Sequence, residues 1–424
     1  MKLKPLFFLA LLFSIQFIFS CKTTVTGTYL LEDQVKTMDL ADGVGNRRSA
    51  CHDYLNYAPD TNHLEFTPVK YIRVNFHFMN SSDSSQNYTG QKAIDFANTI
   101  LQGANYMFNN NKKAYLPRNN DIPVLPVRIQ YVLTPRDNDP DDDGIYFHYD
   151  DECYYMVKKG KNSTLTHKTA FERYGVMKDT VLNVFLIPHH PDSVKSPTYG
   201  AFLMGIAMGD FVKVAWNFNT TEELDAIQMR GTFNHEVAHI YSLVHAWAYN
   251  DGCDDTPLHP LDTLSNNIMD YRSQQLSLTP CQIGKMHWRM STPRATGRKF
   301  LEPLWCFRDP NKTIFIKDSI EWMTQKDLEG DLVITEGAQL RIGCRISIPK
   351  DGRIIVEPGA KLILENAQLH NDCGDKWQGI EVQESKKGVG EVISIGKVKI
   401  EDVEFPLNRD ASGEKPRTFK KKAS

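Results

Sequence analysis

The feature that most constrains the fold of this chain is an H-E-x-x-H run, His235 to His239, followed by a third histidine, His245. Residues four apart lie one above the other on a helix face, so His235 and His239 can present imidazole nitrogens to a single ion. His245 is too far along to continue that face. It reaches the same ion only if the chain turns sharply after Ser242. The pattern therefore predicts a helix that carries two metal ligands and ends beside a tight turn.

The residue types in this run indicate hydrolytic chemistry. Three imidazoles that leave one coordination position open are typical of a catalytic zinc site. Glu236 follows the first ligand and faces the open side, where its carboxylate can take a proton from a water that zinc has made acidic. We therefore predict a zinc-dependent peptide-bond hydrolase acting on a protein or peptide. The alternative is a solvated helix whose histidines face water, although chance produces this spacing only rarely.

The spacing of the three histidines resembles that of the metzincin zinc peptidases. Met269 stands 24 residues after His245 in a turn-rich context, and the order of the motifs around it resembles the pappalysin-like (cytophagalysin) family in particular. The resemblance covers about residues 67–300. It implies an α/β (α+β) fold, a hydrophobic floor under the zinc ligands formed by Met269, and an edge strand within residues 205–216 that pairs with extended substrate.

The resemblance also carries expectations for single residues. Tyr271 would be a phenol that donates to the oxyanion, although on sequence alone it is equally a packed aromatic. The family has glycine where Ser242 stands, because the turn takes a left-handed backbone that serine adopts at a cost of about 1 kcal/mol. Whether His245 reaches the metal with serine there stays open. The resemblance also implies a Cys253–Cys281 disulfide, although here the second cysteine lies beside Gln282 instead of nearer Met269.

The first twenty residues have the features of a targeting segment. Two lysines precede an apolar run of about fifteen residues, which is short for a membrane-spanning helix. The run ends at Cys21 in a sequence that resembles a bacterial lipobox. We therefore expect residues 1–20 to be removed and Cys21 to be lipidated, which predicts an exported protein anchored by lipid to a bacterial membrane, at the outer membrane or cell surface. The alternative is a plain secretory signal with an incidental cysteine.

Export makes disulfide pairing the expected state of the other cysteines. Seven of the eight cysteines remain once Cys21 carries lipid, so at least one of them is unpaired within the chain. Cys51 lies upstream of the predicted catalytic domain. Its thiol either forms a simple disulfide or acts as a latency switch, in which a thiolate from a pro-segment occupies the open zinc position.

The length of 424 residues predicts two domains. Residues 21–66 show no sustained periodicity, so we interpret them as a spacer or pro-segment. Residues 67–305 alternate strand-like and helix-like patterns and form the predicted metallopeptidase domain.

A second, β-rich module is predicted for residues 312–407. The pattern of Ile334–Ile342 recurs 22 residues later in Val356–Leu364, which is typical of one coil of a parallel β-solenoid. We expect a short all-β, β-solenoid-like module, followed by a disordered tail over residues 408–424. A second interpretation of the whole chain follows, in which it is a catalytically weak or inactive surface adhesin that binds through this module.

Two further signals bear on ligands. Asp139, Asp141 and Asp143 alternate in an acidic run that ends in glycine, so they form either a calcium loop or a solvated acidic loop. The formal net charge of −3, without a basic stripe, gives no support to nucleic-acid binding. The sequence does not indicate an oligomeric state.

Overall fold

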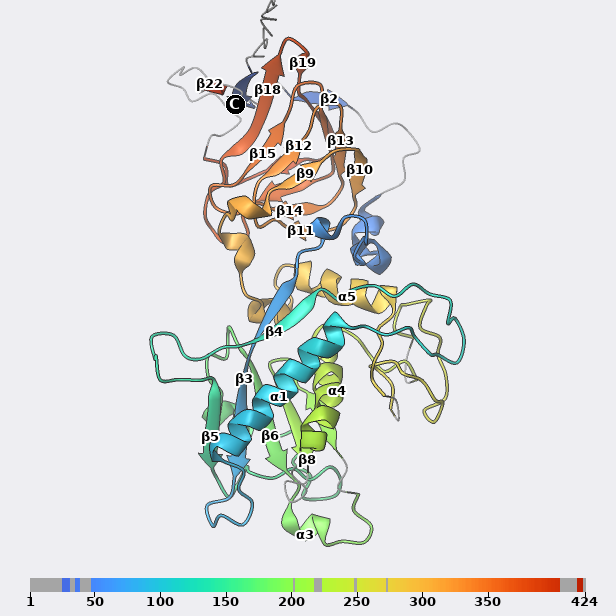
Figure 1. Cartoon of the computed structure of the whole chain (residues 1–424), viewed down its shortest axis with the longest axis vertical. Helices are drawn as coiled ribbons and strands as arrows, with labels where there is room; N and C mark the ends of the chain where they lie inside the picture. The colour runs from blue at the N-terminus through green and yellow to red at the C-terminus, as the bar shows by residue number, and fades with distance from the viewer. Residues whose placement is uncertain are drawn as a thin grey trace, which may run out of the picture.

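The structure is a computed structural model that describes residues 25–30, 35–38, 47–200, 203–216, 223–247, 250–271, 274–404 and 418–421. It is a mixed α/β structure with many strands and few helices. In Figure 1 a strand-rich module lies above an α/β module, and helix α5 (Pro280–Ser291) lies between them. The predicted targeting segment and Cys21 lie outside the described residues.

The α/β module is built on one six-stranded sheet with the order β4-β3-β6-β8-β7, in which β5 also pairs with β3. All pairings are parallel except that of β7 with β8, so β7 forms an antiparallel edge. Central strands such as β6 are buried along their whole length, which explains their continuous apolar sequences. The strands are β3 (Lys70–Asn80), β4 (Ile129–Leu133), β5 (Ile145–Tyr149), β6 (Leu182–Pro188), β7 (Met204–Ala207) and β8 (Phe211–Trp216).

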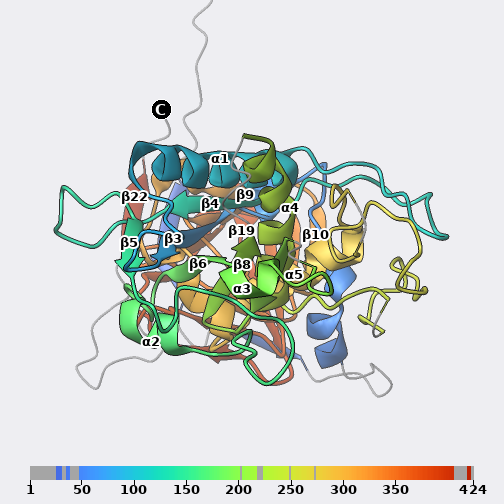
Figure 2. The same cartoon turned by 90° about the horizontal axis from the view of Figure 1, so that it is seen from below.

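Two long helices, α1 (Gly90–Asn109) and α4 (Glu223–Ile240), pack against each other and against this sheet (Figures 1 and 2). The apolar residues of α1 recur at helical spacing, which places one face of the helix in the core. Helix α4 continues without a break through Gly231. Two short helices, α2 (Thr169–Tyr174) and α3 (Pro191–Val194), complete the module.

The strand-rich module consists of three sheets whose repeated strands all run parallel. Each sheet receives one strand in turn, so the chain passes from the first sheet to the second and third and then back. The first sheet contains β9 (Ile314–Ile316), β12 (Leu332–Ile334), β15 (Arg353–Val356) and β18 (Gly379–Ser385). The second contains β10 (Ser319–Trp322), β13 (Gln339–Ile342), β16 (Lys361–Glu365) and β20 (Glu391–Ile395), and the third contains β11 (Lys326–Asp327), β14 (Arg345–Ser347), β17 (Gln368–His370) and β21 (Lys399–Ile400).

The 22-residue sequence repeat corresponds to the register in which β12 pairs with β15 and β13 pairs with β16, because each paired residue lies opposite the one 22 positions later. Ile334 pairs with Val356 in the first sheet, and Ile342 pairs with Leu364 in the second. The side chains of these four residues are fully buried in one apolar cluster between the sheets. Equivalent apolar positions of successive repeats therefore stack on one another and form the core of the module.

Both ends of the chain add strands to this module, which differs from our interpretation of residues 21–66 and 408–424. Strand β1 (Val25–Tyr29) pairs antiparallel with β18, and β2 (Lys36–Met38) pairs parallel with β20. Strand β22 (Thr418–Lys421) pairs with β1, while β19 (Gly388–Val389) pairs with β18. A sheet edge has unpaired backbone groups that a short polar segment can satisfy without an apolar pattern of its own, and this is why periodicity missed these strands.

Residues 47–66 connect the modules through three short 3-10 helices, Arg47–His52, Tyr54–Tyr57 and Leu64–Phe66. Three disulfides are present, Cys51–Cys344, Cys253–Cys281 and Cys306–Cys373. Cys153 is the free cysteine of the described residues. Within the part of the chain that the structure describes, no helix combines the length and the apolar character that crossing a bilayer requires.

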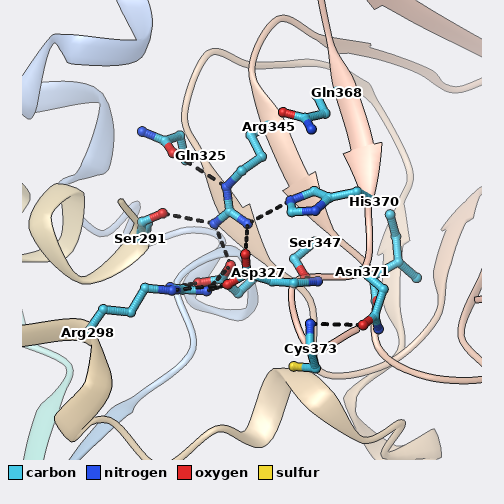
Figure 3. A network of polar contacts seen from close by, with 12 residues as sticks. Ser291, Arg298, Gln325, Asp327, Arg345, Ser347, Gln368, His370, Asn371 and Cys373 are labelled. Carbon is cyan, nitrogen blue, oxygen red and sulfur yellow. Dashed lines mark hydrogen bonds and ion pairs between the residues drawn. The ribbon is translucent and has the colours of Figure 1, made fainter. Parts of the chain in front are cut away.

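A buried ion-pair network joins the two modules (Figure 3). Asp327 on β11 is fully buried, and its carboxylate accepts hydrogen bonds from Arg298 at 2.7 and 3.0 Å and from Arg345 at 2.6 Å. Arg298 belongs to a 3-10 helix that follows α5, and Arg345 also donates to the carbonyl of Ser291 at the end of α5. The network therefore fixes α5 to the third sheet of the strand-rich module.

Candidate metal centre

The three histidines converge at the end of α4. The Nε2 atoms of His235 and His239 are 3.2 Å apart, and Nε2 of His245 lies 3.1 Å from the first and 3.2 Å from the second. Three imidazole nitrogens bound to one tetrahedral zinc at 2.0–2.1 Å would be separated by about 3.3 Å. The donor set and its spacing therefore fit a single zinc ion.

The hydrogen bonds on the far side of two of the rings support this assignment. Nδ1 of His235 donates to the carbonyl of Ile268 at 2.7 Å, and Nδ1 of His239 donates to the carbonyl of Leu243 at 2.8 Å. These bonds place the ring proton on Nδ1, so the two Nε2 atoms carry lone pairs that point toward each other. Converging lone pairs repel unless a cation lies between them, so the arrangement suits a bound metal.

The turn that brings His245 back forms with serine in the place of glycine. Helix α4 ends at Ile240, and Ser242 has a φ of 72°, in the left-handed region. The amide of Leu243 then donates to the carbonyl of Ala238 at 3.0 Å, which closes the end of the helix. Ser242 therefore makes the turn that the histidine spacing demands, and the serine does not keep His245 away from the other two imidazoles.

Burial keeps the histidines in the form that binds metal. It lowers the pKa of His235 to about 3, with His239 as the next cause, and it lowers the pKa of His245 to about 4. The pKa of His239 is lowered by burial as well. Because all three imidazoles are neutral at pH 7, each can offer a lone pair.

Glu236 lies beside this group and is almost completely buried. Burial raises the pKa of its carboxyl to about 8, and a hydrogen bond from the backbone of Ala207 on β7 opposes that shift. Edge strand β7 passes directly over the side chain, because a Cβ atom placed on Gly205 would collide with it. The structure therefore brings together the histidines, the candidate base and the edge strand.

Met269 and Tyr271 lie on the turn that faces the histidines. Met269 is fully buried and directly follows Ile268, whose carbonyl orients His235. The ring of Tyr271 lies edge-on to that of His245, with the two centroids 4.8 Å apart, and 44% of the tyrosine is exposed. Tyr271 thus borders the three histidines on the solvent side of the site.

Three features of the site have no signal in the sequence. The indole of Trp247 stacks on His245 with the ring centroids 5.0 Å apart and an interplanar angle of 11°. Asp270 accepts hydrogen bonds from His259 and Ser265, which holds the turn that carries Met269. Gly205 has no side chain and therefore leaves room for the side chain of Glu236. The contact of Gly205 with Glu236 joins two elements far apart in the sequence, and the other two contacts depend on the loop conformations around His245 and Met269.

Two of the predicted sites need correction. Cys51 is bonded to Cys344 on the strand-rich module, so its thiol cannot serve as a latency switch at the metal. Asp139, Asp141 and Asp143 do not form a metal-ligand group among the described residues. Instead, Asp139 and Asp143 cap backbone amides of their own loop. The loop is thus a solvated acidic turn, and it gives calcium no support. The cysteines of the expected Cys253–Cys281 pair do form a disulfide.

No model of a protein family matches the sequence, and no curated protein matches it significantly. Among solved structures, the chain is similar to mirolysin in complex with compound 9, with a TM-score of 0.39 and 16% identity over 55% of this chain and 96% of that one. It is also similar to Tannerella forsythia mature mirolysin in complex with a cleaved peptide, with a TM-score of 0.37, the same identity and the same coverage. These low scores add nothing to the assignment of a reaction, which depends on the geometry of the site.

Proposed function

We propose that this chain is a zinc-dependent endopeptidase of the metzincin, pappalysin-like kind. The observation that carries the proposal is the convergence of the Nε2 atoms of His235, His239 and His245 to within 3.1–3.2 Å of one another, next to a buried glutamate. Backbone carbonyls fix the tautomers of His235 and His239, as is typical of metal-binding histidines and is not required of histidines that only face solvent.

The neighbouring residues have distinct roles in this proposal. Zinc held by the three imidazoles would polarise the scissile carbonyl and lower the pKa of water to near 7. With the positive charge of a zinc ion beside it, the carboxyl of Glu236 would be ionised at pH 7 despite its burial. Glu236 then takes the proton of the attacking water and later passes it to the leaving nitrogen. The hydroxyl of Tyr271 donates to the oxyanion, and the free edge of β7 pairs with the extended backbone of the peptide substrate.

We also propose that the strand-rich module is a short β-solenoid, which the recurring three-sheet order supports, and that the protein is exported and anchored to a bacterial membrane through lipid on Cys21. The adhesin alternative relied on Ser242 keeping His245 from the metal. Because the three imidazoles lie together, that reason for inactivity loses its support, while binding through the strand-rich module stays a prediction.

A peptide-library digest by the wild-type chain and by Glu236→Ala tests the enzymatic proposal, with the zinc content of both measured. We expect about one zinc per chain in both and cleavage by the wild type alone. Glu172→Ala, at an exposed position on α2, is a matched control that should cleave normally. Equal cleavage by Glu236→Ala, or a wild type that binds no zinc, would contradict the proposal.

A further inference from the structure

A partly enclosed cavity of about 200 Å³ lies at the junction of the two modules. A buried water needs roughly 15 Å³ of such space, so the cavity has room for a small ion together with several waters. The α/β module lines it with Lys70, Arg128 and His287, and the strand-rich module lines it with residues 311–314 and 324–329. The lining is rich in hydrogen-bond donors, and two of its lysines have no carboxylate of their own as a counterion.

Lys326 is the first of these lysines. Its Nζ donates to the carbonyl of Phe66 at 2.8 Å and lies 5.1 Å from the ring centroid of Trp322. No carboxylate among the described residues pairs with it. Burial and then the neighbouring Lys70 lower the pKa of Lys326 to about 8, so the ammonium still carries its charge at pH 7.

Lys70 is the second. Its nearest carboxylate is that of Asp327, at 3.7 Å, but Asp327 is already held by Arg298 and Arg345 at shorter distances (Figure 3). Asp372 also pairs with Arg298 at 2.6 Å and lies 3.9 Å from Arg345, but Lys70 shares Asp327 with both arginines and has the longest of the three contacts to it. Glu329 is the remaining buried carboxylate of the lining among the described residues, and it also faces Lys312 at 3.9 Å.

The hydroxyl of Thr324 is a second kind of buried group in this cavity that lacks a partner. Thr324 lines the cavity and is 4% exposed, and within the part of the chain that is described its Oγ1 has no hydrogen-bond partner. A buried donor without a partner costs about 1–3 kcal/mol, and charges removed from water without a counterion cost more. A ligand that accepts hydrogen bonds and carries negative charge would relieve both costs.

We propose that this cavity binds a small tetrahedral oxyanion, phosphate or sulfate, held by the ammonium groups of Lys70 and Lys326 and by the hydroxyl of Thr324. Bound there, the anion contacts residues of both modules and strengthens their junction. This site lies outside the candidate metal centre, and it does not depend on the proposed peptidase activity.

The test uses the full chain, purified without phosphate or sulfate. Phosphate and sulfate are titrated separately by calorimetry, and thermal unfolding is followed at constant ionic strength against sodium chloride. We expect saturable binding of at least one of the two anions, and a Tm that rises more than it does with chloride. Lys326→Met and Thr324→Val should each weaken anion binding and so raise the Kd, the first by at least tenfold.

Lys317→Met, an exposed lysine of the same module, is the matched control and should bind as the wild type does. Thr324→Val keeps the shape of the side chain, so it tests the site even if Lys326→Met fails to fold. The proposal is overturned if neither anion binds saturably, or if the folded cavity variants bind with the wild-type Kd.

Discussion

Strand β7 passes so close to Glu236 that position 205 has no room for a side chain. A Cβ atom on Gly205 would stand 2.5 Å from Oε1 and 2.6 Å from Cδ of Glu236, whereas ordinary contacts begin at 3.4 Å. Cγ of Glu236 would lie closer still, so in Gly205→Ala the glutamate side chain must move by about 1 Å, or β7 must shift by the same amount. Either movement separates the candidate base from the position in which the histidines and the edge strand hold it.

The structure sets the size of the expected effect. A misplacement of about 1 Å at a reacting group can cost roughly a hundredfold in rate, so kcat/KM for a peptide substrate should fall by about that factor. Overpacking costs about 1–3 kcal/mol, and alanine recovers roughly 0.5–1 kcal/mol over glycine within a strand. We therefore expect stability to fall by only about 1 kcal/mol while zinc content stays the same.

A double variant separates this clash from a general effect on β7. Glu236→Ala removes the atoms that the new methyl group would meet, so adding Gly205→Ala to it should cost no stability. Peptide hydrolysis, metal analysis and denaturant unfolding of the four proteins complete the cycle. Hydrolysis by Gly205→Ala within threefold of the wild type, or equal destabilisation in both backgrounds, would refute the reasoning.

Three other predictions follow from described contacts. Asp327→Asn leaves Arg298 and Arg345 buried without their shared carboxylate, so denaturant unfolding should show a loss of about 3–5 kcal/mol at pH 7. Because the two arginines hold the pKa of Asp327 below its usual range, that difference should shrink as pH falls below about 4, and a constant difference would contradict the ion-pair account. Ser242→Gly removes the cost of the left-handed serine, about 1 kcal/mol, but gives the unfolded chain more freedom. The free energy of unfolding should therefore rise by at most about 1 kcal/mol in denaturant unfolding, and a large loss would argue against the observed turn. Chelation of the metal should abolish peptide cleavage and lower the Tm, zinc should restore both, and full activity after verified metal removal would contradict the proposal.

The arrangement of the histidines could be predicted from the sequence because it is mostly local. The spacing of His235 and His239 fixes one helix face, and the position of His245 demands the turn at Ser242. The parallel pairing of strands in the second module could be predicted for the same reason, since residues 22 apart occupy equivalent positions in successive repeats and stack on one another. Patterns within one helix or one repeat need no knowledge of the rest of the chain.

The features that sequence analysis missed are long-range. The partner of Cys51 is 293 residues away, and β1 completes an edge that belongs to β18. Neither segment carries a periodic pattern, because its place is decided by the partner. Gly205 has the same character, since its role is set by the side chain of Glu236 on another element.

If Cys21 carries lipid, as we propose, the pairing of β1 with β18 limits the distance between the strand-rich module and the membrane. Only residues 22–24 separate Cys21 from Val25, and three extended residues span at most about 11 Å. A lipid on Cys21 would therefore hold the strand-rich module against the bilayer surface. The α/β module, on the other side of α5, would then be held at a fixed distance from the bilayer by the strand-rich module, without a long flexible linker.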